Sequence, residues 1–245
     1  MLYAVLGMET KIISHRGRTS KKSIDNSLES VNNAIDLNAD MVEVDVRRTK
    51  DSQIICFHDS DIEGQLIRDL HYSEIIAINS QVPTLEQVLW SAKDKIGIEI
   101  ELKEVGYEEE VISITRDYFD YNNFVMKSFH SEVVEEVKKI DQKICTGLLL
   151  GSAFTFEQLF IIIKEAMSSS VFKQTRANFI SPYYKLVNAG WFSKFSRNKI
   201  PIQAWTVNDI ESIRTLINQQ VHSIVTDIPE IAIGIRESLS NVDSK

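Results

Sequence analysis

Residues 41–46 read MVEVDV, and this short stretch decides how the rest of the chain can fold. Side chains alternate between the two faces of an extended strand, so the three valines lie on one face while Glu43 and Asp45 lie on the other. The valines favour a strand whose apolar face is covered by other elements. Two carboxylates on the opposite face are costly to bury unless they are paired or bind a metal ion. The pattern alone fits an edge strand with a solvated polar face equally well.

A second stretch repeats the pattern. Residues 96–103 read IGIEIELK, in which an apolar set alternates with Glu99, Glu101 and Lys103. An amphipathic strand with ion pairs to its neighbours would look the same, but two such strands in one chain favour a shared charged site. Carboxylate oxygens are hard ligands, so three of them suit Mg²⁺, Ca²⁺ or Mn²⁺ rather than Zn²⁺.

Outward from these stretches, short β-rich runs alternate with patterns of helical spacing, which predicts a parallel sheet. We expect an α/β fold formed by a single irregular (β/α)₈ TIM barrel. There are nine runs for eight places, so one is expected to be peripheral, and the link between residues 46 and 54 is too short for a crossover helix. The runs are residues 11–14, 41–46, 54–58, 96–102, 124–129, 144–150, 178–182, 202–207 and 223–227.

The composition favours one globular domain over residues 1–245. The chain is 43% hydrophobic and 25% charged, with 4 Pro, 9 Gly and no linker-like tract. These values are close to the globular average and exclude a wholly disordered or fibrous chain. The net charge of −8 argues against a nucleic-acid partner but is compatible with a phosphate-bearing small substrate. Cys56 and Cys145 lie in apolar runs, so we expect buried free thiols rather than a disulfide or a metal site.

No apolar run reaches the ~20 residues of a membrane-spanning helix, so no membrane span is expected. Residues 1–11 lack the basic region and the long apolar stretch of a signal peptide. We therefore expect a cytoplasmic protein. The oligomeric state stays open.

Catalytic side chains of such barrels project from the carboxyl ends of the strands. Two histidines end predicted strands, each beside a polar residue: His15 precedes Arg16, and His58 precedes Asp59. Two histidines in such places favour an acid/base pair. The remaining histidines, His71, His130 and His222, are expected to be non-catalytic.

Taken in order, these segments resemble the glycerophosphodiester phosphodiesterase family over about residues 11–232. Each motif is weak alone, whereas the ordered set is specific. The matching segments are His15-Arg16-Gly17, Asp25-Asn26-Ser27, residues 41–46, Thr49-Lys50-Asp51, His58-Asp59, residues 100–103, Ser128-Phe129, residues 204–208 and residues 226–229.

The resemblance implies a barrel of the phosphatidylinositol-phospholipase-like type that binds one divalent cation. It implies Glu43, Asp45 and Glu101 as the metal ligands and His15 and His58 as the acid/base pair. It also implies that Arg16 and Lys103 bind the phosphate and that Trp205 lies against the substrate. From the residues alone, Trp205 is equally acceptable as a filler of the barrel core. Three carboxylates and one divalent cation sum to −1, and the two cationic side chains raise the total to about +1, which suits a phosphodiester.

The chain departs from the family pattern near the predicted site. Asp25 stands where the family has Glu, so no ligand role is assigned to it. Asn26 has an alternative role as a helix N-cap, with Glu29 at the third helical position. The stretch after Asp59 is shorter than in the family and lacks its Arg-Thr-Thr.

The resemblance predicts an enzyme, a metal-dependent phosphoric diester hydrolase. Its substrates would be glycerophosphodiesters such as glycerophosphocholine, and its products sn-glycerol 3-phosphate and an alcohol. One alternative is a phospholipase D-type enzyme that acts on lysophospholipids with the same fold. Another is a barrel that binds a phosphodiester without catalysis, although such a binder would have no need of two histidines.

Overall fold

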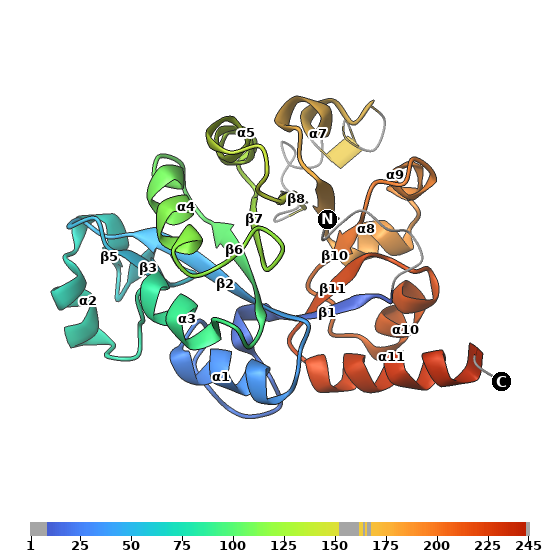
Figure 1. Cartoon of the computed structure of the whole chain (residues 1–245), viewed down its shortest axis with the longest axis horizontal. Helices are drawn as coiled ribbons and strands as arrows, with labels where there is room; N and C mark the ends of the chain where they lie inside the picture. Colours follow the sequence, from blue (N-terminus) through green and yellow to red (C-terminus); the bar gives the residue numbers. More distant parts are fainter. Residues whose placement is uncertain (1–8, 152–161, 164, 166–167, 244–245) are drawn as a thin grey trace.

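Eight parallel strands form the centre of the computed structural model, which describes residues 9–151, 162, 163, 165 and 168–243 (Figure 1). The expectation that the chain has no signal peptide rests on residues 1–11, and residues 1–8 of that stretch lie outside the described residues. The strands are β1 Lys11–Ser14, β2 Met41–Arg48, β6 Gly97–Leu102, β7 Phe124–Ser128, β8 Thr146–Leu150, β9 Phe179–Pro182, β10 Gln203–Ala204 and β11 Ser223–Thr226.

The order of these strands is β10-β11-β1-β2-β6-β7-β8-β9. Parallel bridges from Ile180 to Ile202 and from Tyr183 to Trp205 place β9 beside β10, which brings the sheet round to a nearly closed barrel. The predicted eight-stranded α/β barrel is confirmed.

The ninth predicted run is the peripheral one. Strand β3, Ile54–Cys56, pairs antiparallel with β2, as the short link after Val46 requires. A small outer unit follows it, with the hairpin strands β4 Asp61–Ile62 and β5 Gln65–Leu66. Its core is a separate apolar cluster, and Figure 1 shows it beside β3 at the edge of the barrel. The unit is completed by the 3₁₀ helix η2 Ile67–Asp69 and by α2 Tyr72–Ile78.

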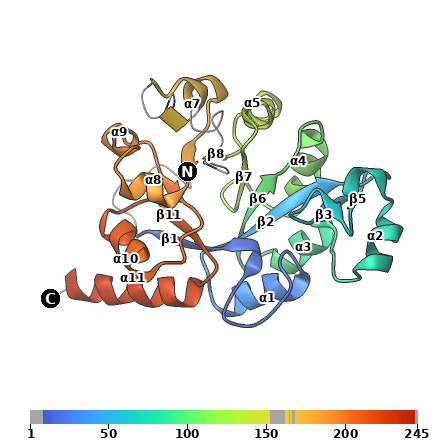
Figure 2. The ribbon, with the colours of Figure 1, turned by 180° about the vertical axis from the view of Figure 1, so that it is seen from behind.

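Helices surround the strands in both views of the ribbon (Figures 1 and 2). A capping box begins α3, because Thr84 and Gln87 exchange hydrogen bonds at its first turn. The remaining helices are η1 His15–Gly17, α1 Leu28–Asp36, α4 Glu108–Arg116, α5 Ser131–Ile140, α7 Ser170–Thr175, α8 Tyr184–Asn188, α9 Ser193–Arg197, α10 Ile210–Asn218 and α11 Pro229–Asp243, and α3 itself is Leu85–Ala92.

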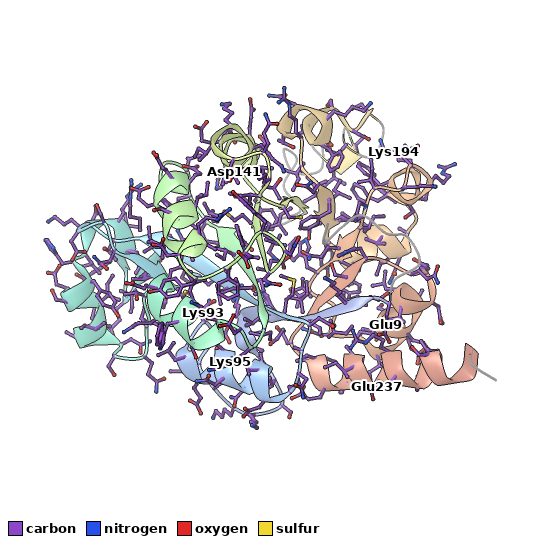
Figure 3. The ribbon with its side chains drawn as sticks, in the orientation of Figure 1. Glu9, Lys93, Lys95, Asp141, Lys194 and Glu237 are labelled. Carbon is purple, nitrogen blue, oxygen red and sulfur yellow. The ribbon has the colours of Figure 1, made fainter. Side chains whose placement is uncertain are left out.

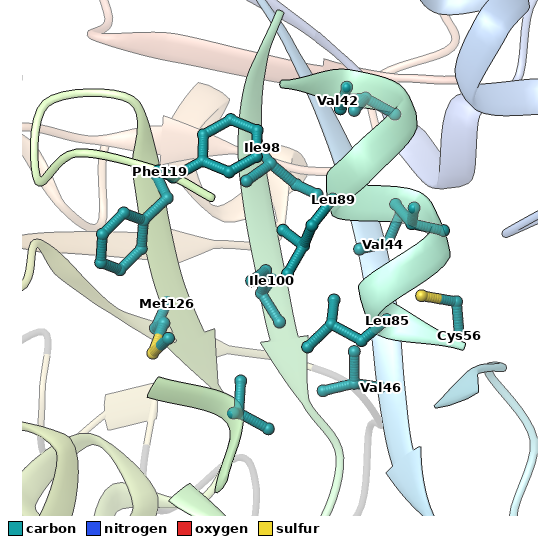
Figure 4. Packing of buried hydrophobic residues seen from close by; sticks show 14 of the residues in the cluster. Val42, Val44, Val46, Cys56, Leu85, Leu89, Ile98, Ile100, Phe119 and Met126 are labelled. Atoms are coloured by element: carbon teal, nitrogen blue, oxygen red, sulfur yellow. The ribbon is translucent and has the colours of Figure 1, made fainter. Parts of the chain in front are cut away.

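In β2 and β6, the alternating side chains point to opposite sides of the barrel wall: the apolar ones outward and the charged ones inward. The valines of β2 and the isoleucines of β6 pack outward against the Leu85 and Leu89 side chains of α3 (Figure 4). Burying each such side chain contributes about 1.5–3 kcal/mol. This packing fixes which face of each strand is covered, and it therefore turns Glu43, Asp45 and Glu101 toward the barrel axis.

The barrel interior is apolar near the amino ends of the strands. Its side chains are Ile13, Met41, Val125, Cys145, Phe179 and Val225. Both cysteines are free and buried, as expected, and burial raises the pKa of each thiol. The predicted metal ligands lie on the carboxyl-end side of this apolar layer.

Charged side chains on the outside of the barrel are exposed, such as Lys93 and Lys95 in the turn after α3 and Glu237 on α11 (Figure 3). Within the described residues, no helix combines the length and the apolar character needed to cross a membrane.

The ring of Phe179 on β9 packs directly against Gly147 of β8. A Cβ atom at Gly147 would lie 2.1 Å from the nearest ring carbon, far inside van der Waals contact. We expect Gly147→Ala to lower the free energy of unfolding by about 1–3 kcal/mol, as overpacking of a rigid core does. Urea unfolding measures this change. Gly234→Ala on α11 is the matched control, because its added Cβ meets no atom within 4 Å. An unfolding midpoint for Gly147→Ala equal to that of the control would contradict the prediction.

Candidate active site

The three predicted metal ligands lie together inside the barrel. Glu43 and Asp45 come from β2 and Glu101 from β6, and Asp45 is directly opposite Glu101 in the strand register. One carboxylate oxygen from each residue lies within 4.8 Å of the others. The side chains are almost inaccessible to solvent. Two adjacent strands therefore place three carboxylates at one point, as their alternation predicted.

The chemistry of this cluster fits a divalent cation. Glu43 Oε1 and Asp45 Oδ1 are buried, and neither accepts a hydrogen bond from any described residue. Burial raises the pKa of Glu101 to about 7, and the charges of Asp45 and Glu43 add to this effect against the opposing charge of Lys103. Crowded carboxylates, with oxygens that accept no hydrogen bond, are the donor set that Mg²⁺, Ca²⁺ and Mn²⁺ prefer.

Arg16 and Lys103 supply positive charge at the same point. Arg16 Nε lies 3.1 Å from Asp45 Oδ2, and Lys103 Nζ lies 3.2 Å from Asp45 Oδ1 and 2.5 Å from Glu101 Oε1. Burial alone would raise the pKa of Asp45, but the charges of Lys103 and Arg16 and a hydrogen bond from Asn26 lower it to about 2. Both residues predicted to bind phosphate are thus brought to the cluster.

A strained turn places Arg16. Its φ of 55° lies in the left-handed region, which a non-glycine residue adopts at a cost of about 1–3 kcal/mol. The next residue, Gly17, has φ 72°, and a Cβ there would lie 2.6 Å from Ser30. In this conformation the Arg16 N–H donates to Glu43 Oε2 at 3.0 Å. The turn therefore joins the end of β1 to the carboxylate cluster through its backbone.

Asn26 is a site residue whose role the sequence left open. Its amide Nδ2 donates to Asp45 Oδ2 at 2.9 Å, and its Oδ1 accepts from the Asp45 N–H at 3.0 Å. The alternative role as an N-cap is wrong, because the Ser27 hydroxyl accepts from the Ser30 N–H at the start of α1. Asn26 instead fixes Asp45 from both its backbone and its side chain.

His15 is paired with a carboxylate that sequence reasoning missed. His15 Nδ1 lies 2.6 Å from Asp227 Oδ1, and Asp227 Oδ2 accepts from Asn208 Nδ2 and lies 3.1 Å from Arg18. Burial opposes ionisation of Asp227, but the hydrogen bond and charge of His15, together with Arg18, lower its pKa to about 2. Asp227 follows β11, so its position after a strand end was the available signal.

Asp25 also lies in this network, away from the ligand oxygens. It accepts two hydrogen bonds from Arg18, at 2.7 and 2.6 Å, and lies 3.5 Å from Arg16. Asp25, which is one methylene shorter than the Glu of the family pattern, therefore pairs with the two arginines.

His58 is held near the cluster through its backbone. Its carbonyl oxygen accepts two hydrogen bonds from the buried Arg47 of β2, at 2.9 and 2.8 Å. Its Nδ1 lies 2.7 Å from Asp59 Oδ1. Burial, followed by the nearby charge of Lys103, lowers the pKa of His58. This shift favours the neutral imidazole, which is the form that accepts a proton.

Trp205 lies at the barrel mouth in an aromatic group rather than in the charged cluster. Its indole N–H donates to the Ser181 carbonyl at 2.7 Å, and its ring centroid is 5.3 Å from that of Phe129 and 5.9 Å from that of Tyr183. The ring is half-buried over the apolar interior. It thus fills the top of the core and also lines the mouth.

The three other histidines lie in different settings. His130 Nε2 is 3.2 Å from the Lys103 carbonyl oxygen, and His71 Nδ1 is 3.8 Å from Asp51. His222 precedes β11, at the opposite end of the barrel from the cluster. A non-catalytic role for each stays a prediction.

The model of the glycerophosphoryl diester phosphodiesterase family matches residues 15–231. The chain belongs to this family. Its members are phosphoric diester hydrolases, and the ordered motifs found in the sequence are thereby explained. Among the relatives of this chain is a Bacillus subtilis protein, YhdW, whose name describes it as a glycerophosphodiester phosphodiesterase. The two sequences are 30% identical, and the match covers 91% of this chain and 96% of YhdW.

Solved structures of the family have the same barrel. A glycerophosphodiester phosphodiesterase from Parabacteroides distasonis superposes with a TM-score of 0.79 at 25% identity, over 95% of this chain and 98% of that one. An Oleispira antarctica phosphodiesterase, solved in complex with the product sn-glycerol-3-phosphate, has a TM-score of 0.76 at 19% identity, over 94% of this chain and 97% of that one.

The pairing of Asp227 predicts a pH-dependent contribution to stability. Its folded-state pKa of about 2 lies below the ~3.9 of an unfolded Asp. The stabilisation is therefore fully present above the unfolded pKa and is lost as the pH falls through about 2. We expect Asp227→Asn to lower the free energy of unfolding at pH 7 by about 2 kcal/mol, and this deficit to shrink by roughly half between pH 5 and pH 3.

Urea unfolding of both proteins across this pH range measures the deficit. Asp94→Asn, at an exposed turn before β6, is the matched control and should show a small difference at every pH. A deficit for Asp227→Asn that does not change with pH would show that the pairing with His15 and Arg18 contributes nothing.

Proposed function

We propose that this protein hydrolyses glycerophosphodiesters, such as glycerophosphocholine and glycerophosphoethanolamine, to sn-glycerol 3-phosphate and an alcohol. The observation that carries the proposal is the buried cluster of Glu43, Asp45 and Glu101, in which two carboxylate oxygens accept no hydrogen bond from the described residues. Family membership supports the reaction class. The product found in the Oleispira antarctica structure supports the substrate class. We propose that the whole chain forms one catalytic domain.

Charge supports the choice of substrate. The three carboxylates and one divalent cation, Mg²⁺ or Ca²⁺ with Mn²⁺ as a third candidate, sum to −1. Arg16 and Lys103 raise the total to about +1, and both lie within 3.2 Å of a cluster carboxylate. A phosphodiester carries one negative charge, so its binding would neutralise the site.

The residues divide the chemical work. A bound cation would stabilise negative charge on a nonbridging phosphate oxygen. Arg16 and Lys103 would hold the phosphate through charge-assisted hydrogen bonds. One of His15 and His58 takes the proton of the attacking oxygen, and the other gives a proton to the leaving oxygen. Asp227 would keep the His15 ring in place through Nδ1, as the 2.6 Å contact indicates.

Removal of either histidine tests the acid/base assignment. We expect His15→Ala and His58→Ala each to lower the turnover of glycerophosphocholine by about 10²–10⁴-fold, since proton transfer would be left to water. His222→Asn is the matched control, because His222 precedes β11 at the far end of the barrel. Release of glycerol 3-phosphate is the measurement. A near-normal rate for either alanine variant would remove that histidine from the mechanism.

Metal dependence tests the cluster. Protein stripped with a chelator is expected to release no glycerol 3-phosphate from glycerophosphocholine, and addition of Mg²⁺, Ca²⁺ or Mn²⁺ is expected to restore release. Glu101→Gln should require at least about tenfold more cation, because one ligand charge is lost. Glu110→Gln, on the exposed face of α4, should behave as the wild type. Full turnover by stripped protein would contradict the metal site, and tight binding without product would favour a binding protein.

A second candidate substrate is an acylated lysophospholipid, cleaved on the same side of the phosphate by phospholipase D-type chemistry. The half-buried aromatic group of Phe129, Tyr183 and Trp205 favours it, because this group offers apolar surface at the barrel mouth. Comparison of kcat/KM for lysophosphatidylcholine and glycerophosphocholine decides between the two. A higher value for the acylated compound would replace the first proposal with this one.

A further inference from the structure

A fourth carboxylate, Glu99, lies inside the barrel, opposite Glu43 in the register of β2 and β6. It precedes Glu101 by two residues on β6, so it shares the inner face with Glu101 and lies one layer nearer the amino end of the barrel than that residue. Glu99 is 0% exposed and is paired with Lys127 of β7, which is 2% exposed. Figure 1 shows β2, β6 and β7 as successive strands, so the three carboxylate-bearing and lysine-bearing strands are neighbours.

Lys127 lies between two carboxylates and is closer to one of them. Its Nζ is 2.8 Å from Glu99 Oε2, which is hydrogen-bond distance, and 3.6 Å from Glu43 Oε1, which is not. Glu43 Oε1 is one of the two buried oxygens that accept no hydrogen bond from the described residues. The ammonium group therefore balances charge in the interior without occupying the oxygen that faces it.

Glu99 is itself held in place. Its second oxygen, Oε1, accepts from Gln203 Nε2 at 2.8 Å. Gln203 also donates to the Ser223 hydroxyl at 3.1 Å and accepts from the Ser181 hydroxyl at 2.9 Å. All of these side chains are fully buried. Both oxygens of Glu99 are thus engaged, and the carboxylate cannot turn away from Lys127 without breaking this network.

We propose that Glu99 is a positioning residue for the metal centre, which retains the ammonium group of Lys127 and so keeps Glu43 Oε1 available to the cation. The inference rests on the metal site of the proposed function. Without the charge of Glu99, the nearest carboxylate to Lys127 is Glu43, at 3.6 Å, and pairing with Glu43 would offset the cost of leaving the buried ammonium unpaired. Lys127 would then compete with the metal for one of its three ligands.

The test uses Mn²⁺ binding to the chelator-stripped full-length chain, measured by calorimetry. We expect Glu99→Gln to raise the Kd for Mn²⁺ at least about tenfold, since a competing charge acts at short range in the interior. The double variant E99Q/K127M removes the competitor as well, and we expect its Kd to return to within about threefold of the wild-type value. Glu108→Gln, at a buried Glu on α4 outside the barrel interior, is the matched control and should bind as the wild type.

The double variant gives the proposal its distinctive outcome. A merely structural role for the pair predicts that losing both charges harms binding at least as much as losing one. A Kd for E99Q/K127M as high as that of Glu99→Gln, or a wild-type Kd for Glu99→Gln, would overturn the inference. If Glu99→Gln does not fold, as judged by circular dichroism, the double variant alone decides: a Kd tenfold above wild type overturns the proposal and a wild-type Kd supports it.

Failure of the proposed function is distinguishable from failure of this inference. Wild-type protein that binds Mn²⁺ and releases no glycerol 3-phosphate would overturn the function, while the affinities of the variants would still decide the role of Glu99. Wild-type protein that is active but whose affinity does not depend on Glu99 would overturn only the inference. Wild-type protein that binds no Mn²⁺ would overturn both.

Discussion

The burial of four carboxylates inside one barrel is the constraint on which the rest of the site depends. An unpaired carboxylate removed from water costs several kcal/mol, so each must be compensated by a cation or by hydrogen bonds. Three cationic side chains reach the interior, which leaves a net charge of −1 before any metal ion binds. The carboxylates are those of Glu43, Asp45, Glu99 and Glu101, and the cations are those of Arg16, Lys103 and Lys127.

The need to compensate these charges also determines the backbone conformation near the cluster. In its left-handed conformation Arg16 donates its N–H to Glu43 and places its guanidinium beside Asp45, and these contacts stabilise the conformation. The Arg16 carbonyl accepts from the Asn26 N–H, and Asn26 in turn holds Asp45. The turn after β1 and the segment before α1 are therefore fixed by the charge of the cluster, and the strain at Arg16 is offset by electrostatic stabilisation.

The sequence predicted the features that depend on residues close together in the chain, and missed those that depend on distant residues. The alternation in residues 41–46 and 96–103 placed Glu43, Asp45 and Glu101 on one side of a barrel wall, and the structure brings them together. The pairing of His15 with Asp227 could not be read from any pattern, because it joins residues 212 apart. The role of Lys127 was equally hidden, since the run FVMKSF shows a lysine in an apolar strand but not the carboxylates that it meets.

The irregular part of the barrel has a consequence for the site. The link after β2 is too short for a helix, so the chain turns back and β3 runs antiparallel to β2. The reversed chain returns along β2, and the Phe57 N–H donates to the Asp45 carbonyl oxygen. His58 is the next residue, and Arg47 of β2 holds its carbonyl. A regular crossover would carry the chain away from the barrel mouth at this point. The same departure from regular topology that leaves β3 outside the ring therefore brings a second histidine to the cluster, on elements independent of those that carry His15.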